Sequence, residues 1–127
     1  MNQSASFTAA AVYTPGGLIA ANSGLLYHEQ LTLASGQNLL RGAVLGKVTA
    51  TGKYILSASA AADGSQTPAA ILVDDIDASA ADKAVLGYTR GDFLASGLTL
   101  GAGHTVASVR AAFKDVGIFI YTEIGGL

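Results

Sequence analysis

The sequence predicts an α+β domain that is mostly β, a small barrel or sandwich with one late helix and an extended N-terminal arm. Three observations predict this fold class. Short β-like runs recur from Leu25 onward and are separated by Gly or by Ser and Asp turn signals. Glycine accounts for 16 of the 127 residues, well above its usual share of about 7%. Helical spacing of apolar residues appears only in residues 105–114.

The first 24 residues differ from the rest of the chain. They contain no charged side chain, a Pro15-Gly16-Gly17 breaker, and no sustained period of 2 or 3.6. Their apolar side chains are too numerous for a segment that is solvated for its own sake. We therefore predict that residues 1–24 form an arm suited to ordering on another protein, and that residues 25–127 form a single domain. The alternative is a frayed terminus that touches its own domain.

The strands are expected where β-like residues run between turn signals. The predicted runs cover residues 25–33, 42–50, 53–58, 69–75, 83–89, 92–95 and 117–121. Thr51-Gly52 separates the second and third runs and predicts a hairpin in which Gly supplies a positive φ. Residues 58–68 have the composition of a surface loop, with Asp63-Gly64 as its turn.

The one predicted helix covers residues 105–114. Its apolar residues fall at i, i+3, i+6 and i+7, and they are Val106, Val109, Ala112 and Phe113. Thr105 suits the N-cap, Lys114 suits the negative end of the helix dipole, and Gly117 suits termination.

Charge and composition exclude several classes of partner. Seven Lys and Arg against nine Asp and Glu give a net charge of -2, which offers no basic footprint for nucleic acid. The absence of Cys excludes disulfides and thiolate metal sites. The longest aliphatic stretches, residues 69–73 and 116–121, fall short of the roughly 18 residues of a membrane span, and the N-terminus has no basic region. We expect a protein without a membrane partner that is made in the cytoplasm.

A calcium loop is the metal site that the acidic residues most nearly match. Asp75, Asp77 and Ser79 occupy positions 1, 3 and 5 of such a loop. Position 6, which needs Gly, is Ala80, and position 12, which needs Glu, is Leu86. These residues therefore predict a solvated acidic turn between two strands and no metal site.

No arrangement of residues predicts catalysis or a cofactor. His28 and His104 are far apart in sequence and lack ligand spacing, so we expect a half-exposed strand residue and a loop residue before the helix. Ser96 lies in a turn sequence without an identifiable base, and Gly101-Ala102-Gly103 lacks the Lys-Ser/Thr of a phosphate loop. Arg90-Gly91-Asp92 is a short match to an integrin-binding string, which we interpret as a turn between strands.

Several segments, taken in order, resemble the head decoration proteins of tailed bacteriophages, the lambda protein D family. They are similar to the family's PGGL segment, the strand that opens its domain, its DG-containing strand entry, its Y-x-x-G-x-F hairpin and its closing strand. The matching segments here are residues 13–18, 39–46, 63–72, 88–93 and 116–118.

This resemblance implies a compact "β-tulip" domain without enzymatic activity. It also implies a homotrimer on the outer capsid surface of the virion, at three-fold and quasi-three-fold sites. The implied partner is the major capsid protein of the same phage, and the implied role is to stabilise the expanded head against the pressure of packaged DNA.

In that role we expect the arm to add a strand to an exposed sheet edge of the capsid protein. The candidate capsid-binding residues are Phe7, Val12, Tyr13, Thr14, Pro15, Gly16, Gly17, Leu18 and Ile19. Because ordering costs about 1 kcal/mol or more per residue, we expect the arm to stay loose until it meets a preformed edge. Three arms on one trimer raise the effective concentration and slow release.

Three alternatives belong to other classes. The first is another structural virion component, such as a tail or neck adaptor, which would assemble as a ring rather than occupy three-fold sites. The second is a small β-barrel module that binds carbohydrate or peptide, although the chain has no Trp and five scattered Tyr, which do not suggest an aromatic platform. An enzyme is the third alternative and has no supporting motif.

Overall fold

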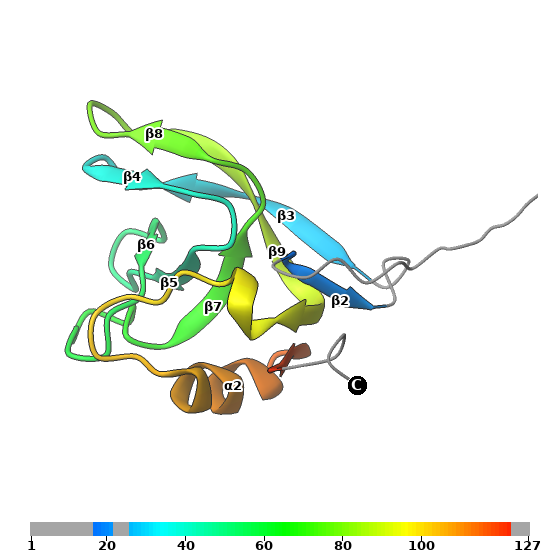
Figure 1. Ribbon diagram of the computed structural model, residues 1–127. Helices are drawn as coiled ribbons and strands as arrows, with labels where there is room; N and C mark the ends of the chain where they lie inside the picture. Colours follow the sequence, from blue (N-terminus) through cyan, green and yellow to red (C-terminus); the bar gives the residue numbers. More distant parts are fainter. Residues whose placement is uncertain (1–16, 22–25, 123–127) are drawn as a thin grey trace, which may run out of the picture.

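The computed structural model describes residues 17–21 and 26–122 (Figure 1). The mostly β fold class with one α-helix among the described residues is confirmed. The strands are β2 (Ile19–Ala21), β3 (Tyr27–Leu33), β4 (Gln37–Leu39), β5 (Val44–Lys47), β6 (Tyr54–Leu56), β7 (Pro68–Leu72), β8 (Ile76–Ala78), β9 (Lys83–Leu94) and β10 (Ile118–Tyr121). The helices are a short 3₁₀ turn, η2 (Ala95–Gly97), and α2 (Val106–Lys114).

Five strands close into a barrel, in the order β9, β3, β6, β5 and β7. β3 runs antiparallel to β9 and meets β6 in parallel through Leu33 and Tyr54. β7 returns to β9 through the pairs Ile71–Tyr88 and Leu72–Gly87, which closes the ring. The sequence predicted a small barrel or a sandwich, and the structure is the barrel.

The predicted hairpin at Thr51-Gly52 is confirmed. β5 and β6 are antiparallel, and Val48 N donates to Lys53 O at 2.8 Å. Gly52 has a φ of 74°, a backbone conformation that glycine adopts without steric cost. The turn is longer than expected, because β5 ends at Lys47 and β6 begins at Tyr54.

β9 is one strand of 12 residues, not two runs joined by a turn. The prediction that Arg90-Gly91-Asp92 turns between strands, as in a Y-x-x-G-x-F hairpin, is therefore wrong. Gly91 is buried within the strand at a φ of 144°. A Cβ on Gly91 would lie 2.5 Å from Leu26 Cδ2 and 3.1 Å from the Phe93 ring. Glycine is needed here for the positive φ and for close packing.

The last residues of β9 carry a second, smaller set of pairings. β2 runs antiparallel to this part of β9, with Ile19 opposite Phe93. β10 runs parallel to it, from Ile118 opposite Gly91 to Tyr121 opposite Leu94. The predicted closing strand is confirmed, whereas β2 lies in the segment that we expected to be an arm.

Thr105 is the N-cap of helix α2, as predicted. The Thr105 side chain accepts a hydrogen bond from Ser108 N at 3.2 Å, and Thr105 N donates to Ser108 Oγ at 3.0 Å, which forms a capping box. Val109 and Phe113 are fully buried. Figure 1 shows the helix below the barrel, with β10 beside it.

The buried side chains form two clusters. One joins the barrel to α2, β2 and β10, and contains Leu18, Val44, Ile71, Tyr88, Phe93, Val109, Phe113, Ile118 and Ile120. The other fills the opposite part of the barrel, and contains Leu31, Leu33, Ala43, Leu45, Ala70, Leu72, Ala78 and Val85. Burial of both clusters supplies the hydrophobic stabilisation of the domain.

A two-stranded sheet of β4 and β8 extends from the barrel. Gln37 lies opposite Ala78, and Leu39 lies opposite Ile76. Asp75, Asp77 and Ser79 were expected to lie in a solvated acidic turn between two strands. The acidic side chains are indeed exposed, but β8 occupies the middle of this segment and buries Ala78.

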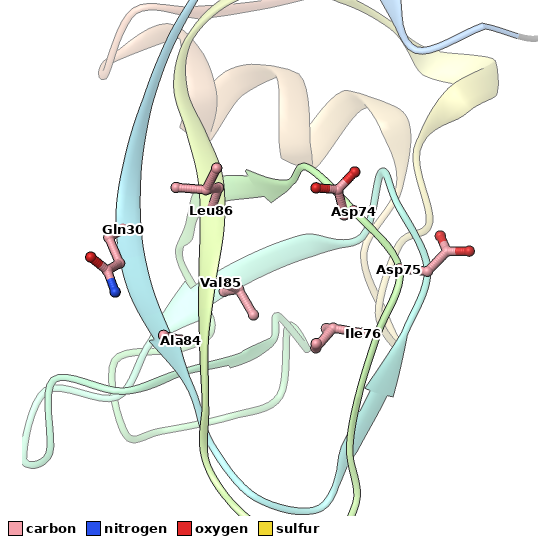
Figure 2. A pocket seen from close by; sticks show the side chains of 7 residues that line it. All are labelled: Gln30, Asp74, Asp75, Ile76, Ala84, Val85 and Leu86. Carbon is pink, nitrogen blue, oxygen red and sulfur yellow. The ribbon is translucent and has the colours of Figure 1, made fainter.

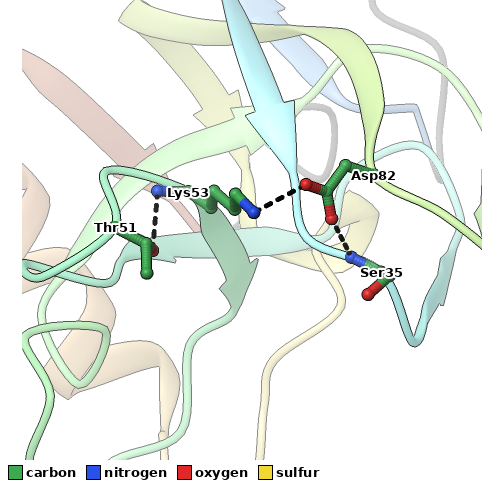
Figure 3. A network of polar contacts seen from close by, with 4 residues as sticks. All are labelled: Ser35, Thr51, Lys53 and Asp82. Atoms are coloured by element: carbon green, nitrogen blue, oxygen red, sulfur yellow. Dashed lines mark hydrogen bonds and ion pairs between the residues drawn. The ribbon is translucent and has the colours of Figure 1, made fainter.

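Three turns at one end of the barrel are joined by Asp82 (Figure 3). Its carboxylate accepts a hydrogen bond from Ser35 N at 2.8 Å and pairs with Lys53 Nζ at 2.7 Å. Lys53 N also donates to Thr51 Oγ1 at 3.2 Å. The hydrogen bond from Lys53, followed by that from Ser35 N, lowers the pKa of Asp82. Because both charged side chains are more than a third exposed, solvent weakens this ion pair.

Candidate functional site

Most of the predicted capsid-binding residues lie outside the part of the chain that the structure describes. These are Phe7, Val12, Tyr13, Thr14, Pro15 and Gly16. The other three, Gly17, Leu18 and Ile19, are described, and they belong to the folded domain. Leu18 is 6% exposed in the core, and Leu94 N donates to Leu18 O at 2.7 Å. The Leu18 side chain therefore packs in the core of its own domain and is not available to contact another protein.

Six large hydrophobic side chains are exposed among the described residues, and four of them lie on or beside β10. Phe119 and Tyr121 project from β10, where they alternate with buried Ile118 and Ile120. The four exposed side chains, which we call the aromatic patch, are Tyr27, Val116, Phe119 and Tyr121. Exposed apolar groups that gather in this way are typical of a protein interaction surface.

Two hollows flank the aromatic patch, and Phe119 lines both. The larger has a volume of about 530 Å³ and is lined by Leu26, Tyr27, Arg90, Gly91, Asp92, Gly117 and Phe119. The smaller, of about 140 Å³, is lined by Arg110, Lys114, Ile118, Phe119, Ile120 and Tyr121. Arg110 Nε donates to Ile120 O at 3.0 Å and so occupies a backbone acceptor of this edge strand.

A second apolar surface lies between β9 and the segment that leads into β8. It is a hollow of about 250 Å³, which we call the acidic hollow, lined by Gln30, Asp74, Asp75, Ile76, Ala84, Val85 and Leu86. Figure 2 shows Val85 and Ile76 pointing toward each other across it, with the Asp74 and Asp75 carboxylates at its rim. Leu86 is 40% exposed here.

Arg41 fixes the position of the acidic hollow. Its backbone N–H donates to Asp75 Oδ1 at 2.7 Å. Its guanidinium turns inward, where it donates to Val73 O at 2.7 Å and lies 5.8 Å from the centre of the Tyr88 ring. These contacts join the β4–β5 connection to the β7–β8 connection, so the rim of the hollow is held by the barrel.

His104 is bound more extensively than the sequence suggested. Its Nε2 lies 3.1 Å from Ser57 Oγ and 3.0 Å from Gln66 O, and its Nδ1 lies 2.9 Å from Ser108 Oγ. The ring thus joins the segment after β6, the loop before β7 and the first turn of α2. Expected only as a loop residue before the helix, His104 is a structural connection that no local sequence signal identifies.

Ser57 and His104 do not form a nucleophilic site. The Ser57 hydroxyl is fully buried and donates to Ser65 O at 2.6 Å. A catalytic serine must instead present its oxygen to a substrate while it gives its proton to the base.

The Asp75–Ser79 segment is organised by local hydrogen bonds. Asp77 Oδ1 accepts hydrogen bonds from the Ser79 hydroxyl and from Ser79 N, which lower the pKa of Asp77. Within residues 17–21 and 26–122, no group of three or more His, Asp or Glu side chains is placed to hold a metal ion. Over the same residues, no helix has the length and apolar character needed to cross a membrane.

The chain matches one family model, that of bacteriophage lambda head decoration protein D, over residues 7–119. The match includes all the candidate capsid-binding residues of the arm, the whole barrel and α2. No curated protein matches the chain.

Proposed function

Because the chain belongs to the bacteriophage lambda head decoration protein D family, which has a structural role on the phage capsid, we propose that it binds the outside of the expanded head as a trimer. It occupies three-fold and quasi-three-fold sites and stabilises the shell against the pressure of packaged DNA. The family match over residues 7–119 is the observation that carries this proposal.

The arm that contacts the capsid protein comprises residues 1–16 in this proposal. We shorten it from residues 1–24 because Leu18 is used by the core of the domain and β2 pairs with β9. Residues 1–16 contain no charged side chain and include Phe7, Val12 and Tyr13. An uncharged segment of this kind supports strand addition, in which backbone hydrogen bonds give affinity and alternate side chains give register.

The barrel serves as the rigid body from which the arm extends. The bond between Leu94 N and Leu18 O connects the residues that follow the arm to β9, the longest strand among the described residues. Force on the arm therefore reaches β9, which pairs with β3 and β7 in the closed barrel. Such a connection suits a protein that holds neighbouring capsid subunits together without catalysis.

Strand addition by the arm is tested by replacing its apolar side chains while its length is kept. In the test variant, Phe7→Ser, Val12→Ser and Tyr13→Ser are combined. In the matched control, Ser4→Ala, Ser6→Ala and Thr8→Ala are combined. We expect both proteins to fold, the control to co-sediment with expanded heads, and the test variant to lose binding. Equal binding of the two variants would show that these side chains do not bind the capsid.

A further inference from the structure

The exposed large hydrophobic side chains fall on two separate surfaces of the described domain. Four form the aromatic patch around β10, as described above. Of the other two, Leu86 lines the acidic hollow, and Leu40 precedes Arg41, whose backbone N–H binds Asp75 at the rim of that hollow. Each apolar surface is rimmed by charged groups, as interaction surfaces commonly are.

The two surfaces carry opposite charges. Three cations line the hollows beside the aromatic patch, namely Arg90, Arg110 and Lys114. The nearby carboxylates are those of Asp92, which lines the larger hollow, and of Asp115, which follows Lys114. Three positive and two negative groups leave one net positive charge there. At the acidic hollow, two carboxylates, Asp74 and Asp75, stand against Arg41, which leaves one net negative charge.

The two surfaces also differ in shape. Phe119 and Tyr121 project from an edge strand. The acidic hollow is recessed and, at about 250 Å³, is smaller than the roughly 300–1,000 Å³ of a typical ligand site. Its wall is formed by aliphatic groups of Ile76, Ala84 and Val85. Such a hollow suits one aromatic side chain better than a small-molecule ligand.

We propose that the aromatic patch of one protomer enters the acidic hollow of the next, and that this contact, made three times, closes the trimer. This inference rests on the proposed function, whose trimer it explains. Because the two surfaces differ, the contact is heterologous, and a heterologous contact forms a ring when its rotation closes. A two-fold contact centred on either surface alone would instead place its charged rim against an identical one, which is unfavourable.

Lys114 and Asp74 form the ion pair across this interface. Of the cations that line the hollows beside the aromatic patch, Arg110 already donates to Ile120 O. Lys114 is exposed at the end of α2 and lines the same hollow as Tyr121. Among the carboxylates of the hollow, Asp75 already accepts the N–H of Arg41, whereas Asp74 is exposed at the rim. The pair fixes the register of the contact more than it adds affinity.

A disulfide tests this juxtaposition, because the chain contains no Cys. In the Asp74→Cys, Lys114→Cys double variant, oxidation is expected to produce covalent trimers, both in free solution and on expanded heads. The single variants Asp74→Cys and Lys114→Cys serve as controls and are expected to stay monomeric after oxidation and denaturation. Double-variant protein that binds heads but yields no cross-linked species would overturn this inference alone. Unmodified protein that does not bind heads would overturn the proposed function.

Charge reversal provides a second, independent test. We expect Asp74→Lys and Lys114→Glu each to weaken trimer association about five- to tenfold, and the combined variant to recover most of that loss. Additive loss in the combined variant would contradict a direct pair. If Phe119→Ser abolishes head binding while Asp74→Lys changes neither assembly nor binding, the aromatic patch contacts the shell and the proposed interface is wrong.

Discussion

Leu18 and Leu94 are joined by a backbone hydrogen bond of 2.7 Å, and both side chains are buried. This contact connects the residues that follow the arm to the end of β9, a strand that belongs both to the barrel and to the smaller sheet with β2 and β10. The domain and the base of the arm therefore form one mechanical unit.

Replacement of Leu18 tests how far residues 17–21 belong to the domain. Leu18 is 6% exposed and packs among the core side chains, so Leu18→Ala should lower the free energy of unfolding by about 2–5 kcal/mol. The matched control is Leu40→Ala, because Leu40 is 64% exposed, and its effect should stay within about 0.5 kcal/mol. Urea denaturation measures both. Similar small effects would place Leu18 outside the core in solution.

Gly91→Ala tests the continuity of β9. The added methyl group must displace Leu26 Cδ2 and the buried Phe93 ring, in addition to the cost of a positive φ. Gly36 also has a positive φ, but a Cβ there would meet no atom within 4 Å. We expect Gly91→Ala to destabilise the domain by about 1–2 kcal/mol more than Gly36→Ala. Equal losses in thermal or urea unfolding would indicate an open turn at Gly91.

His104→Ala should loosen the connection between α2 and the barrel. The substitution removes contacts to Ser57, Gln66 and Ser108, and a loss of about 1–3 kcal/mol is expected for buried polar partners. Hydrogen exchange should rise in the first turn of α2 and in residues 57–66. His28→Ala is the control, because His28 is exposed on β3. Unchanged exchange in α2 would show that His104 does not hold the helix.

Acid should weaken the turns that meet at Asp82. The pKa of Asp82 is lowered from 3.8 by Lys53 and Ser35 N–H, so the unfolded chain binds the proton more readily than the folded protein. The stabilisation is present above pH 3.8 and is lost as pH falls through the lowered pKa. Asp82→Asn should therefore reduce the loss of stability in this acidic range, measured by urea unfolding. An unchanged pH profile would contradict the contact.

Much of the barrel could be predicted because its signals are local. Alternating or continuous apolar runs bounded by Gly marked most of its strands, and Thr105 with Val109 and Phe113 marked α2. Gly91 misled the prediction, since a glycine needed for packing within a strand has the same sequence signature as one needed for a turn.

The missed elements depend on partners far away in the chain. β2 exists because Ile19 pairs with Phe93, and β4 and β8, three residues each, exist because they pair with one another. The aromatic patch and the acidic hollow are likewise assembled from separate segments, so no sequence period could reveal them. The arm, by contrast, was predicted from composition and its capsid-binding role from the family resemblance, and the role of residues 1–16 stays a prediction.

The most direct test of capsid decoration is to count the copies of the protein that co-sediment with expanded and unexpanded heads of the phage that encodes it. We predict saturable binding to expanded heads only, at three copies per three-fold or quasi-three-fold site, and no binding by a variant that lacks residues 1–16 but keeps Leu18. Binding to neither form of the head, or full binding by the truncated variant, would contradict this account.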